Sequence, residues 1–393
     1  MELIKTNEEL VDVCKSISKE KFITIDTEFI REKTYWSKLC LIQICTHNKE
    51  IIIDPLENNI DLKPFIKILN KKTILKILHS GRQDIEIFYK MSGKIPKPIF
   101  DTQIAAMVCG FGESVGYEKL VDKILNKKID KSSRFSNWAK RPLTKKQLKY
   151  AIGDVTHLFE IYPILKKEIE EKARTDWFKD ELKILLSENT YDVSPEKAYK
   201  RLKIRSYDIK TRAVTYQLAL WREKKAQSNN VPRGRILRDD IIYELASIKP
   251  RSINDINNMR SISNGLKLKE DIKQEIIDNV LIGINLNDKD LPNFPKKRKL
   301  PYGTNSRVSL LKILLNSVSE KHDVAQKLIA STQDLEDLIA DDKSLYFSNN
   351  KNQFFSIDLI TGTFNWETTI NSNIRPTIID DLLFTVSMDG RLI

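Results

Sequence analysis

The sequence predicts a mixed α/β domain followed by an all-helical region and a short β-rich tail. Three observations support this prediction. The apolar segments 22–29, 38–46 and 50–54 follow one another closely enough to pair as antiparallel strands. Through 206–283 apolar residues recur at spacings of three and four, the period of an α-helix. From residue 345 the spacing changes to two, the period of a strand.

The α/β part continues with alternating strands and helices. Segment 72–79 predicts a fourth strand, and the apolar residues of 81–91 that follow it have helical spacing. A short strand at 97–101 leads into a helix of small and apolar residues. Further helices are predicted over 117–126 and from Thr144 onward, because threonine is a favourable N-cap. Three early strands followed by this alternation indicate a mixed sheet.

These patterns divide the chain into five parts, and the polar stretch with three prolines near residue 295 marks a linker. We expect an α/β domain over 1–175, a helical domain over 206–285, the linker over 286–305, a second helical segment over 306–342 and the β-rich tail over 343–393.

The composition is that of a globular protein. The 393 residues are 41% hydrophobic and 31% charged. No stretch approaches the roughly 20 apolar residues of a membrane helix, and the first residues lack the apolar core of a signal peptide. The four cysteines show no CxxC spacing, which predicts reduced thiols and no zinc site. We expect a cytoplasmic protein without a membrane partner.

The charge distribution predicts a polyanionic partner. The formal net charge is +12, and residues 197–238 hold 13 basic residues against Asp208 and Glu223, a local net of +11. A basic block of this kind is typical of nucleic-acid binding. The alternative is a solvated helix face without a partner.

Acidic residues stand at unusual positions in the predicted α/β domain. Asp26 and Glu28 end the first long strand, and side chains at i and i+2 of a strand point to the same face. Like charges that close repel each other unless they are protonated or share a cation. Asp84 stands near the start of the helix after the fourth strand. Asp154 follows Tyr150 by four residues on a helix, so both share one face.

Carboxylate clusters of this composition suit Mg²⁺ or Mn²⁺ rather than zinc or copper. They support phosphoryl transfer with two metal ions roughly 3.5–4 Å apart. We expect Asp26 to bridge both ions, Glu28 and Asp154 to hold the first, and Asp84 to act on the second. The Tyr150 hydroxyl would orient the attacking water rather than abstract its proton, because a phenol of pKa about 10 is a poor base.

Three segments resemble the motifs of the DEDD exonucleases in their tyrosine-bearing subclass, and the closest resemblance is to the ribonuclease D family. The segments are FITIDTEF (22–29), ILKILHSGRQDIEIF (74–88) and LTKKQLKYAIGDVTHL (143–158). The resemblance covers about 1–175 and implies a ribonuclease-H-like sheet, two divalent metal ions and 3′→5′ removal of nucleoside monophosphates from RNA. It implies precursor tRNA 3′ ends as the substrate. All five family residues are present, as Asp26, Glu28, Asp84, Tyr150 and Asp154.

The helical region resembles the nucleic-acid-binding domain named HRDC. Trp221-Arg222, Pro232-Arg233 and the ILxDDxxxxxA pattern that follows carry the resemblance. It implies RNA contacts by Arg222, Arg233 and Arg235, while we expect Trp221 in the core. No GxxxxGK[ST] motif occurs, so no nucleotide cofactor is expected.

A loop before the long helix holds Trp138, Lys140 and Arg141, which could stack on a base and neutralise phosphate. Simple packing is the alternative. His79 could contact the terminal nucleotide or be a hydrogen-bonded core histidine. Asp101 is expected to cap a helix.

Two separate segments of the C-terminal part resemble parts of known domains. Segment 306–342 is similar to the first helices of a second HRDC domain. The tail is similar to one β-propeller blade, through GxxxW at 362–366 and DGRL at 389–392. We interpret it as a truncated second domain joined to a foreign remnant, with a protein-binding hairpin as the alternative.

Two other functions stay open from the sequence. The same chemistry could act on DNA, as in a 3′→5′ exodeoxyribonuclease. The chain could instead be a non-catalytic RNA-binding protein with structural acids, although the complete set of five residues argues against this. The sequence does not fix the oligomeric state, and a monomer is the default expectation.

Overall fold

A computed structural model describes most of the chain. The described residues are 1–57, 60–130, 132–204, 206, 208–265, 267–294, 303–341, 344–348, 353–358, 363–369, 377–379 and 382–384. They form two compact units, one of 1–106 with 114–294 and one of 107–113 with 295–393.

The N-terminal part is built on a six-stranded mixed sheet of order β1-β4-β3-β2-β5-β6. Its strands are β1 (Glu2–Ile4), β2 (Phe22–Ile30), β3 (Lys38–Cys45), β4 (Glu50–Ile53), β5 (Leu75–Leu78) and β6 (Ile99–Asp101). Strands β2, β3 and β4 pair antiparallel, and the other pairs are parallel. The predicted α/β class and the antiparallel pairing of the early strands are confirmed.

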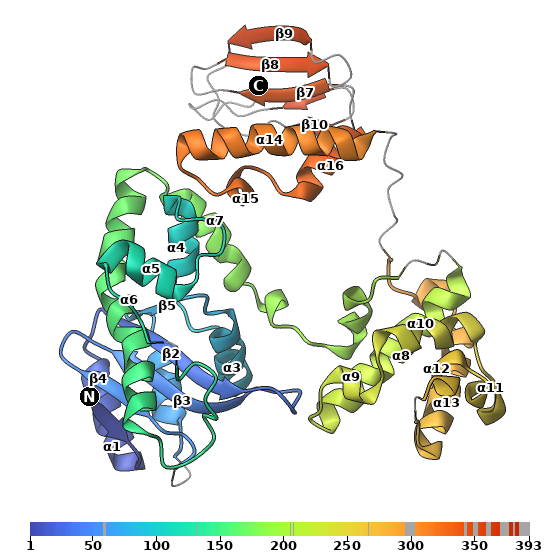
Figure 1. The fold of residues 1–393 in the computed structure, drawn as a ribbon, viewed down its shortest axis with the longest axis horizontal. Helices are drawn as coiled ribbons and strands as arrows, with labels where there is room; N and C mark the ends of the chain where they lie inside the picture. The colour runs from blue at the N-terminus through green and yellow to red at the C-terminus, as the bar shows by residue number, and fades with distance from the viewer. Residues whose placement is uncertain are drawn as a thin grey trace. The chain divides into compact units, whose positions relative to one another are not determined.

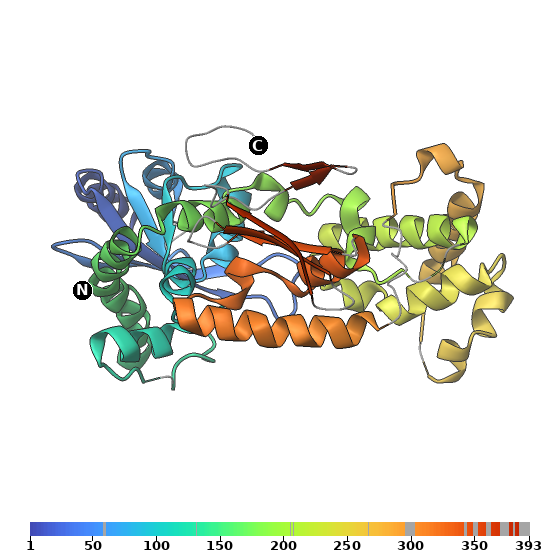
Figure 2. The same ribbon diagram turned by 90° about the horizontal axis from the view of Figure 1, so that it is seen from above.

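Seven helices accompany this sheet. They are α1 (Asn7–Ile17), α2 (Lys63–Leu69), α3 (Arg82–Ser92), α4 (Thr102–Cys109), α5 (Tyr117–Leu125), α6 (Lys145–Glu171) and α7 (Thr175–Leu185). Helix α6 packs across β2, β3 and β4, and α1–α3 lie on the other side of the sheet (Figure 1, Figure 2). Thr144 is the N-cap of α6, as predicted, and forms a capping box with Gln147. Strand β1 and helices α1 and α2 lie outside the elements predicted from the sequence.

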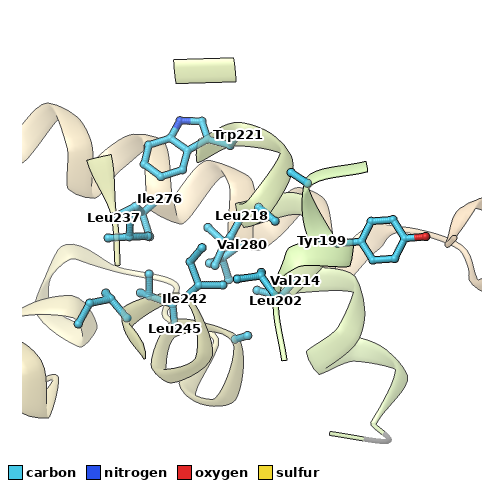
Figure 3. Close-up of a cluster of buried hydrophobic side chains, with 14 of the residues drawn as sticks. Tyr199, Leu202, Val214, Leu218, Trp221, Leu237, Ile242, Leu245, Ile276 and Val280 are labelled. Atoms are coloured by element: carbon cyan, nitrogen blue, oxygen red, sulfur yellow. The ribbon is translucent and has the colours of Figure 1, made fainter. Parts of the chain in front are cut away.

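The helical domain has its own apolar core (Figure 3). Its helices are η2 (Pro195–Arg201), α8 (Ile209–Ser228), α9 (Arg233–Ile236), α10 (Asp239–Ile248), α11 (Ile253–Asn257), α12 (Arg260–Ser263) and α13 (Glu270–Asn285), with η1 (Glu188–Thr190) before and η3 (Asp288–Asp290) after them. Trp221 is buried in this core, as expected. The core extends beyond the predicted bounds, because Tyr199 and Phe294 pack edge to face, 5.2 Å apart between ring centroids. The first residues of the predicted linker therefore belong to the helical domain.

The second unit combines helices and strands. Its helices are α14 (Thr304–His322), α15 (Gln326–Ile329) and α16 (Thr332–Asp341), and α14 packs against α15 and α16. The strands are β7 (Ser344–Ser348), β8 (Gln353–Asp358), β9 (Phe364–Thr369), β10 (Thr377–Ile379) and β11 (Leu382–Phe384). Strands β7–β9 form one antiparallel sheet and β10–β11 another. Gly362 and the DGRL motif lie outside the described residues. Among the described helices, none is both long and apolar enough to cross a bilayer.

Candidate active site

Three of the predicted acids converge where β2 meets α6. Ligand oxygens of Asp26, Glu28 and Asp154 all lie within 4.8 Å of one another. Asp26 and Glu28 share a face of β2, as strand geometry requires. The Thr24 hydroxyl on the same strand donates a 2.8 Å hydrogen bond to the Val155 carbonyl, which ties α6 to β2 beside Asp154.

Asp84 lies next to this group but is not one of its three members. It is buried in the first turn of α3 and accepts a hydrogen bond from the Thr27 hydroxyl. Gly81 lets the helix begin there, because a Cβ at this position would lie 2.7 Å from the Leu78 Cβ. The charge of Asp84 still reaches the group, since it raises the pKa of Asp26.

Burial raises the pKa of every acid in the cluster, and repulsion between the acids adds to this effect at Asp26 and Glu28. The pKa of Asp26 lies well above its usual range because of burial and then the neighbouring Asp84, Asp154 and Glu28. Burial and the charges of Asp154 and Asp84 raise the pKa of Glu28 to about 9. A bound divalent cation would remove this repulsion, and a donor set of carboxylate oxygens fits Mg²⁺ or Mn²⁺.

Two tyrosines surround Asp154. The Tyr150 side chain lowers the pKa of the Asp154 carboxyl, against the larger effect of burial, which raises it. Burial, with the charges of Asp154, Glu28 and Asp26, raises the pKa of Tyr150, so the phenol keeps its proton. The Tyr117 hydroxyl donates to the backbone carbonyls of Asp154, at 2.6 Å, and Gly153, at 3.0 Å. Sequence reasoning missed Tyr117, because a tyrosine that opens a helix carries no local signal of such contacts.

The cluster opens into a pocket of about 410 Å³, a volume in the range of small-molecule sites, about 300–1,000 Å³. Both acidic and basic side chains line it. The lining residues include Asp26, Asp154, Tyr150, Tyr117, His79, Lys119 and Arg134.

The structure corrects two of the three predicted nucleic-acid contacts in the loop before α6. Trp138 is 3% exposed and packs beside Tyr150, so it cannot stack on a base. Arg141 uses all five of its N–H donors internally: two on Asp54, at 2.5 and 2.6 Å, and three on the carbonyls of Trp138, Lys140 and Cys40. Lys140 is exposed and keeps its predicted role as a hypothesis.

Two of the three arginines of the helical domain that were expected to contact RNA are engaged in contacts within the protein, so these predictions are corrected as well. Arg222 is 4% exposed and pairs with Asp239 at 2.6 Å. Arg233 binds the buried Glu223 through two hydrogen bonds and donates to the Tyr35 hydroxyl at 2.7 Å. Both arginines stabilise the fold. Arg235 is exposed, so its predicted RNA contact stays a hypothesis.

Asp101 and His79, the other two residues considered from the sequence, make hydrogen-bonding contacts within the protein. The Asp101 carboxylate accepts hydrogen bonds from the backbone N–H groups of Gly81, at 2.8 Å, and Gln103, at 2.8 Å, so it is the expected cap. His79 Nδ1 lies 3.0 Å from the Thr102 hydroxyl, as in a core histidine, while its ring borders the pocket.

Comparisons with known proteins agree with this geometry. Residues 1–170 match the 3′-5′ exonuclease domain family, and residues 212–269 match the HRDC domain family. The chain is 42% identical to ribonuclease D of Nitrobacter hamburgensis over 342 residues, which covers 87% of this chain and 89% of that protein. It is 40% identical to ribonuclease D of Bartonella henselae, covering 86% of this chain and 82% of that protein. The crystal structure of Escherichia coli RNase D, an exoribonuclease involved in structured RNA processing, superposes with a TM-score of 0.75 at 29% identity, covering 86% and 89% of the two chains.

Proposed function

Because the chain belongs to the ribonuclease D family of 3′→5′ exoribonucleases, we propose that it releases nucleoside 5′-monophosphates one at a time from the 3′ end of RNA. The observation that carries the proposal is the convergence of Asp26, Glu28 and Asp154, whose ligand oxygens lie within 4.8 Å of one another. Asp26 and Asp154 also line the pocket. Precursor tRNA 3′ ends are the proposed substrate. The four buried free cysteines support a reducing, cytoplasmic location.

The acids and Tyr150 would have different roles in hydrolysis. Asp26, Glu28 and Asp154 would hold one divalent cation, and Asp26 with Asp84 would hold a second, Asp84 acting through water because it lies outside the three-acid group. When bound, such cations lower the pKa of the attacking water and stabilise charge on the leaving 3′ oxygen. The Tyr150 hydroxyl, whose raised pKa keeps it protonated, would orient the attacking water by hydrogen bonding.

The test is digestion of single-stranded RNA labelled at the 3′ or the 5′ end, with Mg²⁺, with Mn²⁺ or with EDTA. We expect early mononucleotide release from the 3′ label and a shortening ladder from the 5′ label, both abolished by EDTA. A DNA oligonucleotide of the same sequence measures the preference for ribose. Asp26→Asn should abolish cleavage and leave RNA binding in place. Undiminished cleavage by Asp26→Asn would exclude the proposed site.

A further inference from the structure

Arg134 lies in the catalytic pocket without a role in the chemistry described above. It stands on the segment between α5 and α6 and lines the pocket together with Tyr150 and Asp154. Arg134 therefore borders the same cavity as two of the groups proposed to face the attacking water.

The segment that carries Arg134 is fixed on both sides. Ser133 is 4% exposed, and its carbonyl accepts a 3.0 Å hydrogen bond from the Ser136 N–H. Trp138 is buried against Tyr150, and Arg141 is clamped to Asp54. The loop residues predicted to touch RNA thus hold the segment in place, while the Arg134 side chain itself stays exposed.

The charge balance of the pocket explains why a positively charged side chain is needed there in addition to the metal ions. Two divalent cations would neutralise the four clustered carboxylates, so the filled cluster would offer little net attraction to a phosphodiester. Arg134 and Lys119 are the basic residues among the described residues that line the pocket. Arginine presents a planar fork of donors that matches phosphate oxygens.

An aromatic ring lies beside this arginine. Phe135 is 91% exposed, the largest exposed fraction among the exposed large hydrophobic side chains that the structure describes. Its ring centroid is 5.4 Å from the Arg134 guanidinium carbon. An exposed ring next to an arginine that lines the pocket suits stacking on a base, which needs only a π-face and not a particular sequence.

We propose that Arg134 and Phe135 clamp the 3′-terminal nucleotide of the substrate. The Arg134 guanidinium hydrogen-bonds the phosphate that is hydrolysed, and the Phe135 ring stacks on the base. The inference rests on the proposed exoribonuclease function, so its test needs a measurement that does not depend on turnover.

The test combines RNA hydrolysis with calorimetric binding of uridine 5′-monophosphate, the expected type of product, in Ca²⁺. Arg134→Ala should lower kcat by about 10- to 100-fold and weaken nucleotide binding by about tenfold, as expected for lost charge-assisted hydrogen bonds. Arg134→Lys should recover part of both. Phe135→Ala should raise KM about tenfold with kcat nearly unchanged, and Phe135→Trp should restore KM. Lys128→Ala, which removes a positive charge from the same segment outside the pocket, is the matched control.

The outcomes separate this inference from the proposed function. If Arg134→Ala cleaves RNA and binds the nucleotide as Lys128→Ala does, the clamp is wrong and the exoribonuclease function stands. If the wild-type protein binds the nucleotide without cleaving RNA, the proposed function fails, and loss of binding in Arg134→Ala still supports the clamp. If the wild-type protein neither binds nor cleaves, both fail. Melting temperatures of all variants confirm that each is folded.

Discussion

Replacing Arg141 by alanine should destabilise the fold and leave the electrostatics of RNA binding unchanged. Its guanidinium holds the Asp54 carboxylate, whose side chain is 1% exposed, while Arg141 itself is 19% exposed. Removing one partner of a buried ion pair costs about 3–5 kcal/mol, because the other charge stays buried and unpaired. Since Arg141 retains some contact with water, we take the lower end, about 3 kcal/mol.

Urea unfolding and thermal melting measure this loss. For a domain of this size about 3 kcal/mol corresponds to a fall in melting temperature of about 6–12 °C. Arg141→Lys should lose nearly as much, because lysine keeps the charge but cannot supply the five directed donors. Lys140→Ala is the matched control, since this neighbouring side chain is exposed and should change stability by less than about 0.5 kcal/mol.

The salt dependence of RNA affinity distinguishes the two residues. Each phosphate contact on single-stranded RNA contributes about 0.7 to the slope of log affinity against log salt. Lys140→Ala or Arg235→Ala should reduce that slope by about this amount, and Arg141→Ala should not. If Arg141→Ala instead kept full stability and reduced the slope, its assignment as a structural residue would be refuted.

Three further predictions follow from other parts of the molecule. In EDTA, the raised pKa of Glu28 stabilises the folded state fully below the ordinary value of 4.5 and progressively less as pH rises towards about 9. The melting temperature of the wild-type protein should therefore fall more steeply from pH 5 to 9 than that of Glu28→Gln. Parallel curves of melting temperature against pH would contradict this. Glu223→Gln and Arg233→Gln should each lower the free energy of unfolding in urea by about 2 kcal/mol, because each leaves the other member of a largely buried ion pair without its partner. The double variant should cost much less than their sum, so additive losses would contradict a shared network. Deleting 343–393 should leave RNA hydrolysis intact, and loss of activity in a folded protein would overturn the interpretation of the tail as a remnant.

The proposed catalytic acids could be grouped from sequence because local geometry alone determines their faces. The period of a strand puts Asp26 and Glu28 on one side, and the helical period does the same for Tyr150 and Asp154. The resemblance to the ribonuclease D family, confirmed by the relatives, added that these elements meet.

The loop residues could not be assigned in the same way. Whether Arg141 faces solvent depends on Asp54, which is 87 residues away along the chain. Trp138 is buried in an apolar cluster with residues of β3, β4 and α6. Tyr117 and Arg134 reach the pocket only because α5 and the loop after it fold back over α6. No periodicity within either segment encodes that approach, so burial and contact there follow from tertiary packing.

The basic block shows how the same limitation affects a charge argument. Residues 197–238 have a net charge of +11 by composition. In the folded protein, four cations of the block pair with acids that lie outside it, namely Lys197, Arg222, Lys225 and Arg238. Asp208 of the block pairs with Lys249 outside it, so the effective net charge falls to +8. Arg201 and Arg233 share the buried Glu223 within it. The surface available to a polyanion is therefore less positively charged than the sequence suggests. It includes the exposed side chains Lys200, Lys203, Lys224 and Arg235.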